Sequence, residues 1–188
     1  MITRFISDLQ LSTDRPDITG LFVHFLRTEA RESDALYILG DLFAYWIGDD
    51  DQTDFHRHVI AELQAFTATG VPGYFIAGNR DFLIGERFAK ETGVTILPEH
   101  YVADIYGVPT LLLHGDTLCT DDLGYQKFRK IIRNPLLLGI AKRLPLSWRR
   151  GLAHKLRSGS KSNKPLSEEQ LRKMDTTESA VQEAFSRY

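Results

Sequence analysis

The chain is poor in cysteine, with a single one, Cys119, among its 188 residues. One cysteine cannot form an intramolecular bridge, which excludes a disulfide scaffold and predicts a reducing, cytosolic environment. Long apolar runs are also missing, because the longest, 136–141, is far below the ~20 residues that a membrane-spanning helix needs. The first residues run into a strand-like segment without a secretory leader, so we expect any membrane contact to be peripheral.

The sequence also lacks a charge excess and several familiar catalytic signatures. Its formal net charge of −2 gives no global indication of nucleic-acid binding. It contains no Gly-x-x-x-x-Gly-Lys phosphate loop, no Gly-x-Ser-x-Gly elbow and no Gly-x-Gly-x-x-Gly fingerprint, which disfavours the corresponding nucleotide-binding and hydrolase classes. With 43% hydrophobic residues the chain can bury one substantial core, as in one domain with an insertion or appendage.

Hydrophobic periodicity predicts strands that alternate with helices, the pattern of an α/β sheet with helices packed on it. The predicted helices cover residues 17–33, 53–69 and 82–92. The predicted strands cover residues 2–7, 35–39, 73–77, 94–97, 101–105 and 110–114, with a turn at 106–109.

Four of the strand-like segments run directly into polar residues that can bind a divalent metal. These residues are Asp8 and Gln10, Asp41, Asn79, and His114. Binding groups of α/β sheets gather outside the carboxyl ends of the strands, and residues two apart on an extended segment project to the same side. Each junction alone is explained by an ordinary turn or a buried histidine, whereas four in order favour one metal site.

Mixed carboxylate, amide and imidazole donors suit Mn²⁺, Fe²⁺ or Zn²⁺ better than Ca²⁺. One aspartate that shares its two oxygens can hold two ions ~3.5–4 Å apart, the arrangement used in phosphoester and diphosphate hydrolysis. The other histidine pair, His56 and His58, lies in a predicted helix where i and i+2 side chains diverge. We interpret both as surface residues.

The motif order Asp-x-Gln, Gly-Asp, Gly-Asn-Arg-Asp and His-Gly-Asp resembles the calcineurin-like metallophosphoesterases. The segments 35–43, 46–50, 78–85 and 114–122 are similar to the branch of that family that acts on UDP-2,3-diacylglucosamine in lipid A biosynthesis. The resemblance implies two sheets flanked by helices with a helical cap insertion, a site for two Mn²⁺ ions, and water attack on the α-phosphate. It also implies a hydrolase that works as a peripheral protein on the cytoplasmic side of the inner membrane.

The resemblance further implies a role for individual residues. Asp8 would bind the first metal with Gln10, Asp41 would bridge, and Asn79 and His114 would bind the second. The residues implied in substrate binding are Asn79, Arg80, Asp122, Tyr125, Ser160 and Lys164. A guanidinium fork at Arg80 also suits a diphosphate on chemical grounds, because it can bind phosphate oxygens bidentately.

Two features depart from the family pattern. Gln10 stands where the family has a histidine, and a carboxamide oxygen is a weaker donor than imidazole. Family members also continue into a Gly-His-x-His segment with two more ligands, whereas this sequence ends at Tyr188. Two alternative hypotheses therefore stay open: a non-catalytic or impaired lipid-binding remnant, and a phosphoesterase for another small phosphoester.

Residues 126–164 contain twelve basic residues and no acidic one, interleaved with apolar residues. A solvated basic face would explain the charges, but the one-sided run favours binding to an anionic membrane surface and to a nucleotide-linked glycolipid. Nucleic acid is disfavoured because few aromatic residues are available for stacking. We expect Pro135, Pro145 and Gly151 to break the segment into short helices.

These inferences divide the chain into three parts. They are a metallophosphoesterase core at 1–120, a helical lipid-binding cap at 121–165, and a return helix at 166–188. The sequence leaves the oligomeric state open.

Overall fold

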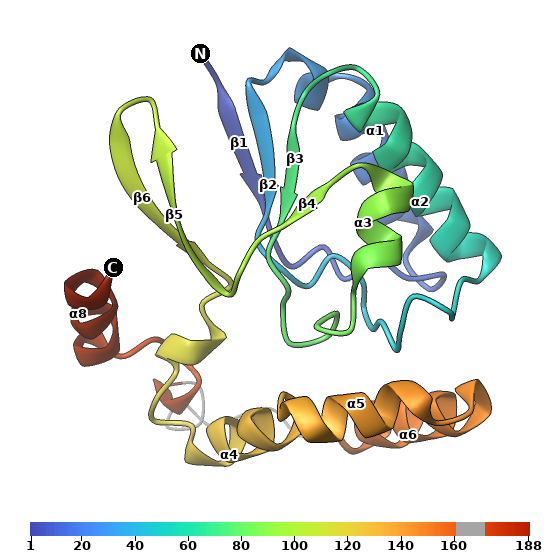
Figure 1. Cartoon of the computed structure of the whole chain (residues 1–188), viewed down its shortest axis with the longest axis vertical. Coiled ribbons are helices and arrows are strands. Elements are labelled where there is room, and N and C mark those ends of the chain that lie inside the picture. Colours follow the sequence, from blue (N-terminus) through green and yellow to red (C-terminus); the bar gives the residue numbers. More distant parts are fainter. Residues whose placement is uncertain (161–171) are drawn as a thin grey trace. The chain divides into compact units, whose positions relative to one another are not determined.

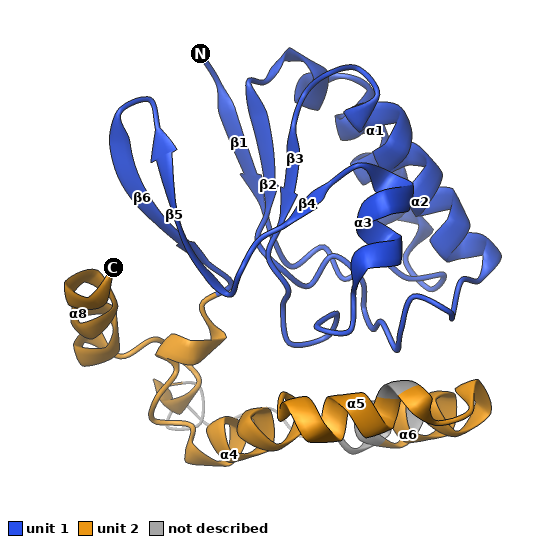
Figure 2. Cartoon of the chain, viewed as in Figure 1, with its two compact units in different colours: residues 1–114 blue, residues 115–188 orange. Residues whose placement is uncertain are grey.

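The computed structural model describes residues 1–160 and 172–188. The chain folds into two compact units, residues 1–114 and 115–188 (Figure 2). The second unit thus starts at Gly115, ahead of the boundary expected after residue 120, and the boundary expected after residue 165 falls outside the described residues.

The first unit contains a four-stranded parallel sheet in the order β1-β2-β3-β4 and an antiparallel β5-β6 hairpin (Figure 1). Helices α1, α2 and α3 connect the parallel strands and cover one face of the sheet, while the hairpin lies on the other face (Figure 1). Right-handed crossovers between strands in sequential order place all connecting helices on one face. The strands are β1 (Thr3–Ile6), β2 (Ala35–Ile38), β3 (Gly73–Phe75), β4 (Thr95–Ile96), β5 (His100–Ile105) and β6 (Val108–Leu113). The helices are α1 (Pro16–Arg27), α2 (Asp54–Thr67), α3 (Glu86–Thr92) and a short 3-10 helix η1 (Glu29–Glu32).

Strand β2 is buried on both faces, because successive side chains of a strand point to opposite sides. Leu36 and Ile38 pack in the core cluster formed with the helices. Tyr37 packs in a second cluster with hairpin residues such as Ala103 and Leu112. The prediction of an α/β fold with two sheets and flanking helices is therefore confirmed.

Several local expectations need correction. The hairpin turn is the two-residue turn Tyr106-Gly107, with φ values of 56° and 85°, and β6 begins at Val108 rather than Thr110. A two-residue hairpin turn needs positive φ at its central residues, because that backbone matches the twist of the flanking strands. The prediction that His56 is a surface residue is wrong. Its ring lies 4.8 Å from the ring of Trp46, and the residue is buried in the core between the sheet and its helices.

The second unit is helical in its described part. It contains a 3-10 helix η2 (Asp116–Leu118), α4 (Leu123–Ile132), α5 (Pro135–Arg143), α6 (Leu146–Ser160) and α8 (Glu178–Arg187). Pro135 and Pro145 lie at the breaks between helices, as predicted, but Gly151 lies inside α6. A single glycine costs a helix interior only ~1 kcal/mol, which neighbouring turns can offset. Among the described residues, no helix has the length and apolarity to cross a membrane.

Candidate metal centre

Asp8, Asp41 and His114 come together in the first unit. Each offers one ligand atom, and these atoms all lie within 4.8 Å of one another. Asp8 and Asp41 follow β1 and β2 at neighbouring carboxyl ends of the parallel sheet, whereas His114 follows β6 of the hairpin. The predicted convergence of these three residues is therefore observed.

The backbone at this centre adopts a conformation that side-chain-bearing residues usually avoid. Among the described residues, four non-glycine residues have positive φ, and three of them are predicted ligands: Asp8 (56°), Gln10 (47°) and Asp41 (52°). Such residues cost ~1–3 kcal/mol each and cluster at functional sites. The expectation that Asp8 and Gln10 lie on an extended segment is wrong, since the chain leaves β1 at Ile6 and turns at both residues.

Backbone hydrogen bonds between the two loops hold this conformation. The Asp8 N–H donates to the Gly40 carbonyl at 3.1 Å, and the Gln10 N–H donates to the Asp41 carbonyl at 2.9 Å. The loops after β1 and β2 therefore continue the strand pairing beyond the sheet and carry Asp8 and Asp41 side by side.

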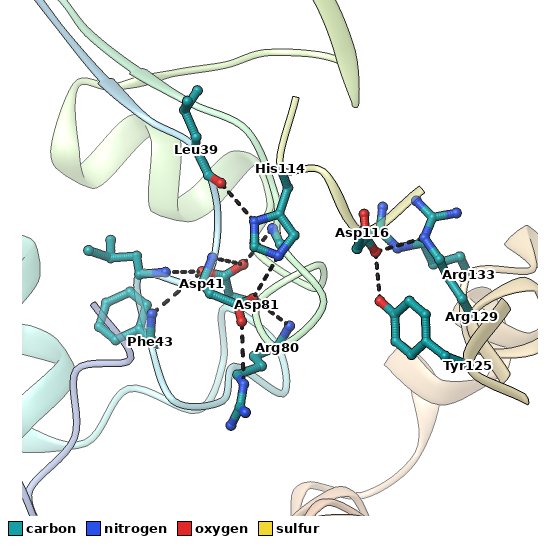
Figure 3. Close-up of polar contacts among 12 residues, drawn as sticks. Leu39, Asp41, Phe43, Arg80, Asp81, His114, Asp116, Tyr125, Arg129 and Arg133 are labelled. Atoms are coloured by element: carbon teal, nitrogen blue, oxygen red, sulfur yellow. Dashed lines mark hydrogen bonds and ion pairs between the residues drawn. The ribbon is translucent and has the colours of Figure 1, made fainter. Parts of the chain in front are cut away.

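The imidazole of His114 is oriented by a backbone carbonyl. Its Nδ1 lies 2.8 Å from the carbonyl oxygen of Leu39, an acceptor (Figure 3). Because a carbonyl oxygen can only accept, this contact places a proton on Nδ1 and turns Nε2 toward Asp41, the usual orientation of a metal-binding histidine. Nε2 lies 3.7 Å from Asp41 Oδ1, and the His114 side chain is 6% exposed.

Asp41 is a buried carboxylate, with a side chain 2% exposed. Its Oδ1 accepts the Arg80 N–H at 3.0 Å, and the Arg80 Nε lies 3.3 Å from Oδ2 (Figure 3). Burial raises the pKa of Asp41, although the hydrogen bond from the Arg80 backbone and the charges of His114 and Arg80 oppose this effect. A cation beside the carboxylate would compensate its desolvation further.

The centre contains one residue to which the sequence analysis gave no role. Asp81 is 0% exposed, and its carboxylate accepts the N–H groups of Gly78 at 2.8 Å and Leu42 at 2.7 Å. Burial, and secondly the nearby Asp41, raise the pKa of Asp81 to about 6. The only sequence signal was an acidic residue at the end of a turn-forming Gly-Asn-Arg-Asp motif, which does not distinguish a buried acceptor from a turn residue.

Gln10 and Asn79 adjoin the centre through their backbones. Gln10 bonds to the Asp41 carbonyl, and Asn79 lies between Gly78 and Arg80, whose N–H groups bond to Asp81 and Asp41. Their placement is compatible with the predicted ligand roles, which stay predictions.

Two predicted substrate-binding residues lie in the second unit and have structural contacts there. Asp122 caps α4, because its Oδ1 accepts the Tyr125 N–H at 2.8 Å. The Tyr125 hydroxyl donates to Asp116 Oδ2 at 2.7 Å, and the Arg129 Nε donates to the same oxygen at 2.8 Å (Figure 3). Burial, with the nearby Arg133, lowers the pKa of Arg129 to about 10, so the guanidinium stays charged at neutral pH.

The substrate-binding roles of Asp122 and Tyr125 stay predictions. The side chain of Ser160 and the whole of Lys164 lie outside the described residues.

The donor set of the first unit fits a divalent cation. It combines two carboxylates with an imidazole whose Nε2 faces one of them. Borderline cations such as Mn²⁺, Fe²⁺ and Zn²⁺ accept this mixture of oxygen and nitrogen ligands.

Comparisons with known proteins agree with this geometry. The family model described as calcineurin-like phosphoesterase matches residues 3–171. A UDP-2,3-diacylglucosamine hydrolase of Vibrio parahaemolyticus is 49% identical over 186 residues, which cover 99% of this chain and 76% of the relative. A protein of the same name from Escherichia coli O7:K1 is 50% identical over 188 residues, covering 100% of this chain and 78% of the relative. One from Photobacterium profundum is 54% identical over 163 residues, covering 87% of this chain and 66% of the relative.

The family match spans most of the sequence, and the relatives align with nearly all of it. Together with the clustered Asp8, Asp41 and His114, they establish that the chain belongs to the calcineurin-like phosphoesterase family.

Proposed function

We propose that the chain is a metal-dependent hydrolase of UDP-2,3-diacylglucosamine in lipid A biosynthesis. Water attacks the α-phosphate, the diphosphate bond breaks, and UMP and 2,3-diacylglucosamine 1-phosphate are released. The observation that carries the proposal is the cluster of Asp8, Asp41 and His114 within 4.8 Å, in a chain about half of whose residues are identical to those of relatives named for this substrate.

The cofactor that we propose is a pair of Mn²⁺ ions. Asp8, with Gln10, would hold the first ion, Asn79 and His114 the second, and Asp41 would contribute an oxygen to each. Divalent ions at such a site lower the pKa of water and neutralise charge on phosphoryl oxygens. The contact between His114 Nδ1 and the Leu39 carbonyl supports this role, because it directs the opposite ring nitrogen, Nε2, at Asp41.

Arg80 is the residue that we assign to the diphosphate. Its Nε faces Asp41, and 42% of its side chain is exposed, so the terminal nitrogens remain accessible to an incoming anion. A phosphate oxygen that approaches the centre would therefore meet a guanidinium already oriented by a buried carboxylate.

We propose that the second unit binds the acyl chains and a membrane surface. Helices α4, α5 and α6 expose large apolar side chains, among them Ile131 (58%), Leu136 (78%) and Trp148 (70%). The same helices carry basic residues of segment 126–164, among them Lys127, Arg143 and Lys155. Apolar side chains with interleaved Lys and Arg are the composition of peripheral helices on anionic lipid, which supports a location on the cytoplasmic side of the inner membrane.

The test is UMP release from UDP-2,3-diacylglucosamine in mixed micelles, with added Mn²⁺ or with EDTA. We expect release that depends on Mn²⁺ and that Asp41→Ala abolishes. The matched control is Asp54→Ala, which removes a carboxylate whose side chain is 99% exposed and which should retain full activity.

Two other results would select the alternative functions. Binding to substrate-containing vesicles without UMP release in excess Mn²⁺ would identify a non-catalytic lipid-binding protein. Faster hydrolysis of a water-soluble phosphodiester than of the acylated substrate would identify another phosphoesterase. Equal turnover by the Asp41→Ala variant would refute the two-ion centre.

A further inference from the structure

Asp81 joins two loops that carry predicted metal ligands. One loop follows β2 and contains Asp41, and the other follows β3 and contains Asn79. Asp81 Oδ2 accepts the Leu42 N–H at 2.7 Å, with a longer contact of 3.5 Å from the Phe43 N–H. Asp81 Oδ1 accepts the Gly78 N–H at 2.8 Å, with a longer contact of 3.3 Å from the Asp41 N–H.

We propose that Asp81 is a positioning residue for the metal centre, an inference that rests on the metal site proposed above. Its two oxygens accept N–H groups from both loops and thereby set the distance between Asp41 and the Asn79-Arg80 segment. Asp81 itself is fully buried and acts through Asp41. Partners behind metal ligands commonly determine how those ligands are oriented.

The chemistry of the contacts explains why a carboxylate stands at this position. Both oxygens face N–H donors, so both must be acceptors, and only an ionised carboxylate offers two. An asparagine would keep one acceptor and would direct an NH₂ group at the remaining N–H donors.

A second carboxylate provides a matched control in the same unit. Asp49 accepts the N–H groups of Gly85 at 3.0 Å, Arg87 at 3.1 Å and Phe88 at 3.2 Å, and also the indole N–H of Trp46 at 3.1 Å. It therefore joins a loop to the start of α3 in the way that Asp81 joins two loops. Asp49 has no hydrogen bond with a predicted ligand among the described residues.

The experiment measures Mn²⁺ affinity by electron paramagnetic resonance titration, with unfolding of each metal-free variant measured in parallel. We expect Asp81→Asn and Asp81→Glu each to weaken Mn²⁺ binding by ~10–100-fold, the range for partners behind metal ligands. The second variant keeps the charge but moves the two oxygens, so it separates position from electrostatic attraction. Asp49→Asn should lower the unfolding midpoint with a change in affinity below about threefold.

Three results would overturn the inference. If Asp81→Glu binds Mn²⁺ like the unmodified chain, charge rather than position is what matters. If Asp81→Asn and Asp49→Asn weaken binding equally, the effect is general loss of stability. If the unmodified chain binds no Mn²⁺, the proposed metal site fails first and this inference fails with it.

A further measurement needs no substitution. In the metal-free chain, the amides of Leu42 and Gly78 should exchange hydrogen slowly, because Asp81 holds them in a buried site. Exchange at the rate of exposed loop amides would contradict the positioning role.

Discussion

Gly78 lies against Asp41 so closely that no side chain fits between them. A Cβ atom built on Gly78 would meet Oδ1 and the backbone nitrogen of Asp41 at separations that real Cβ atoms do not show, with Cγ at 3.0 Å. The neighbour cannot retreat easily, because Asp41 is 2% exposed and its Oδ1 is bonded to the Arg80 N–H. We therefore predict that Gly78→Ala displaces the carboxylate of Asp41.

The size of the effect follows from these distances. Restoring ordinary carbon–oxygen contact needs a shift of about 1 Å, whereas metal–ligand distances tolerate only ~0.2 Å. Changes that disturb the orientation of metal ligands typically cost ~10–100-fold in metal affinity, and we expect a loss of about 100-fold because Gly78→Ala displaces a ligand directly. Overpacking of a buried site typically costs ~1–3 kcal/mol, so the free energy of unfolding in EDTA should fall by a similar amount.

The assay pairs Mn²⁺ titration with urea unfolding in EDTA, and Gly20→Ala is the control. A Cβ at Gly20 meets no atom of the described residues within 4 Å, and Gly20 lies inside α1. Replacing a helical glycine with alanine should stabilise the chain by ~0.5–1 kcal/mol and leave Mn²⁺ affinity unchanged. If Gly78→Ala binds Mn²⁺ within about threefold of the unmodified chain, Asp41 is not a metal ligand in this geometry.

Three further changes test other parts of the chain. Gln10→His should tighten Mn²⁺ binding about tenfold, or ~1.4 kcal/mol, because imidazole is the stronger donor; an unchanged titration would show that Gln10 is not a ligand. The Tyr106 hydroxyl, and secondly the Ile2 N–H, lower the pKa of Asp34 from its ordinary value. Ionised Asp34 therefore stabilises the fold at pH values above its pKa in the unfolded chain. This stabilisation is lost as the pH falls through the lower pKa of Asp34 in the folded chain. Tyr106→Phe should shrink that acid-induced loss and raise the Asp34 pKa measured by NMR; an unmoved pKa would contradict this. Asp122→Ala should cost α4 about 1 kcal/mol of capping energy, seen as faster amide exchange at Tyr125, while Asp122→Asn should retain the cap.

The elements of the first unit were predictable because their signals are local. Helix α2 begins after Thr53, whose hydroxyl accepts the His56 N–H, and its apolar residues recur at helical spacing. The polar residues after β1 and β2 were predictable as neighbours for the same reason, since parallel strands bring their carboxyl ends to one edge of the sheet. Hydrophobic period and strand direction are properties of short segments, and the sequence displays both.

The orientation of the site residues was not predictable in this way. His114 is oriented by the carbonyl of Leu39, 75 residues away in the chain, and Asp81 by an amide 39 residues away. Gly40 lies so close to His114 that an added Cβ would be 2.5 Å from its Nδ1. This contact likewise forms only after the hairpin has packed on the sheet.

The sequence by itself therefore determined which segments form strands and helices and which polar residues follow them. Only the tertiary structure decided that His56 is buried in the core, that Asp8 and Gln10 turn with positive φ, and that Asp81 joins two loops. The physical reason is that a buried polar group needs a partner, and the partners in this centre are backbone groups that strand pairing and packing bring together from distant parts of the chain.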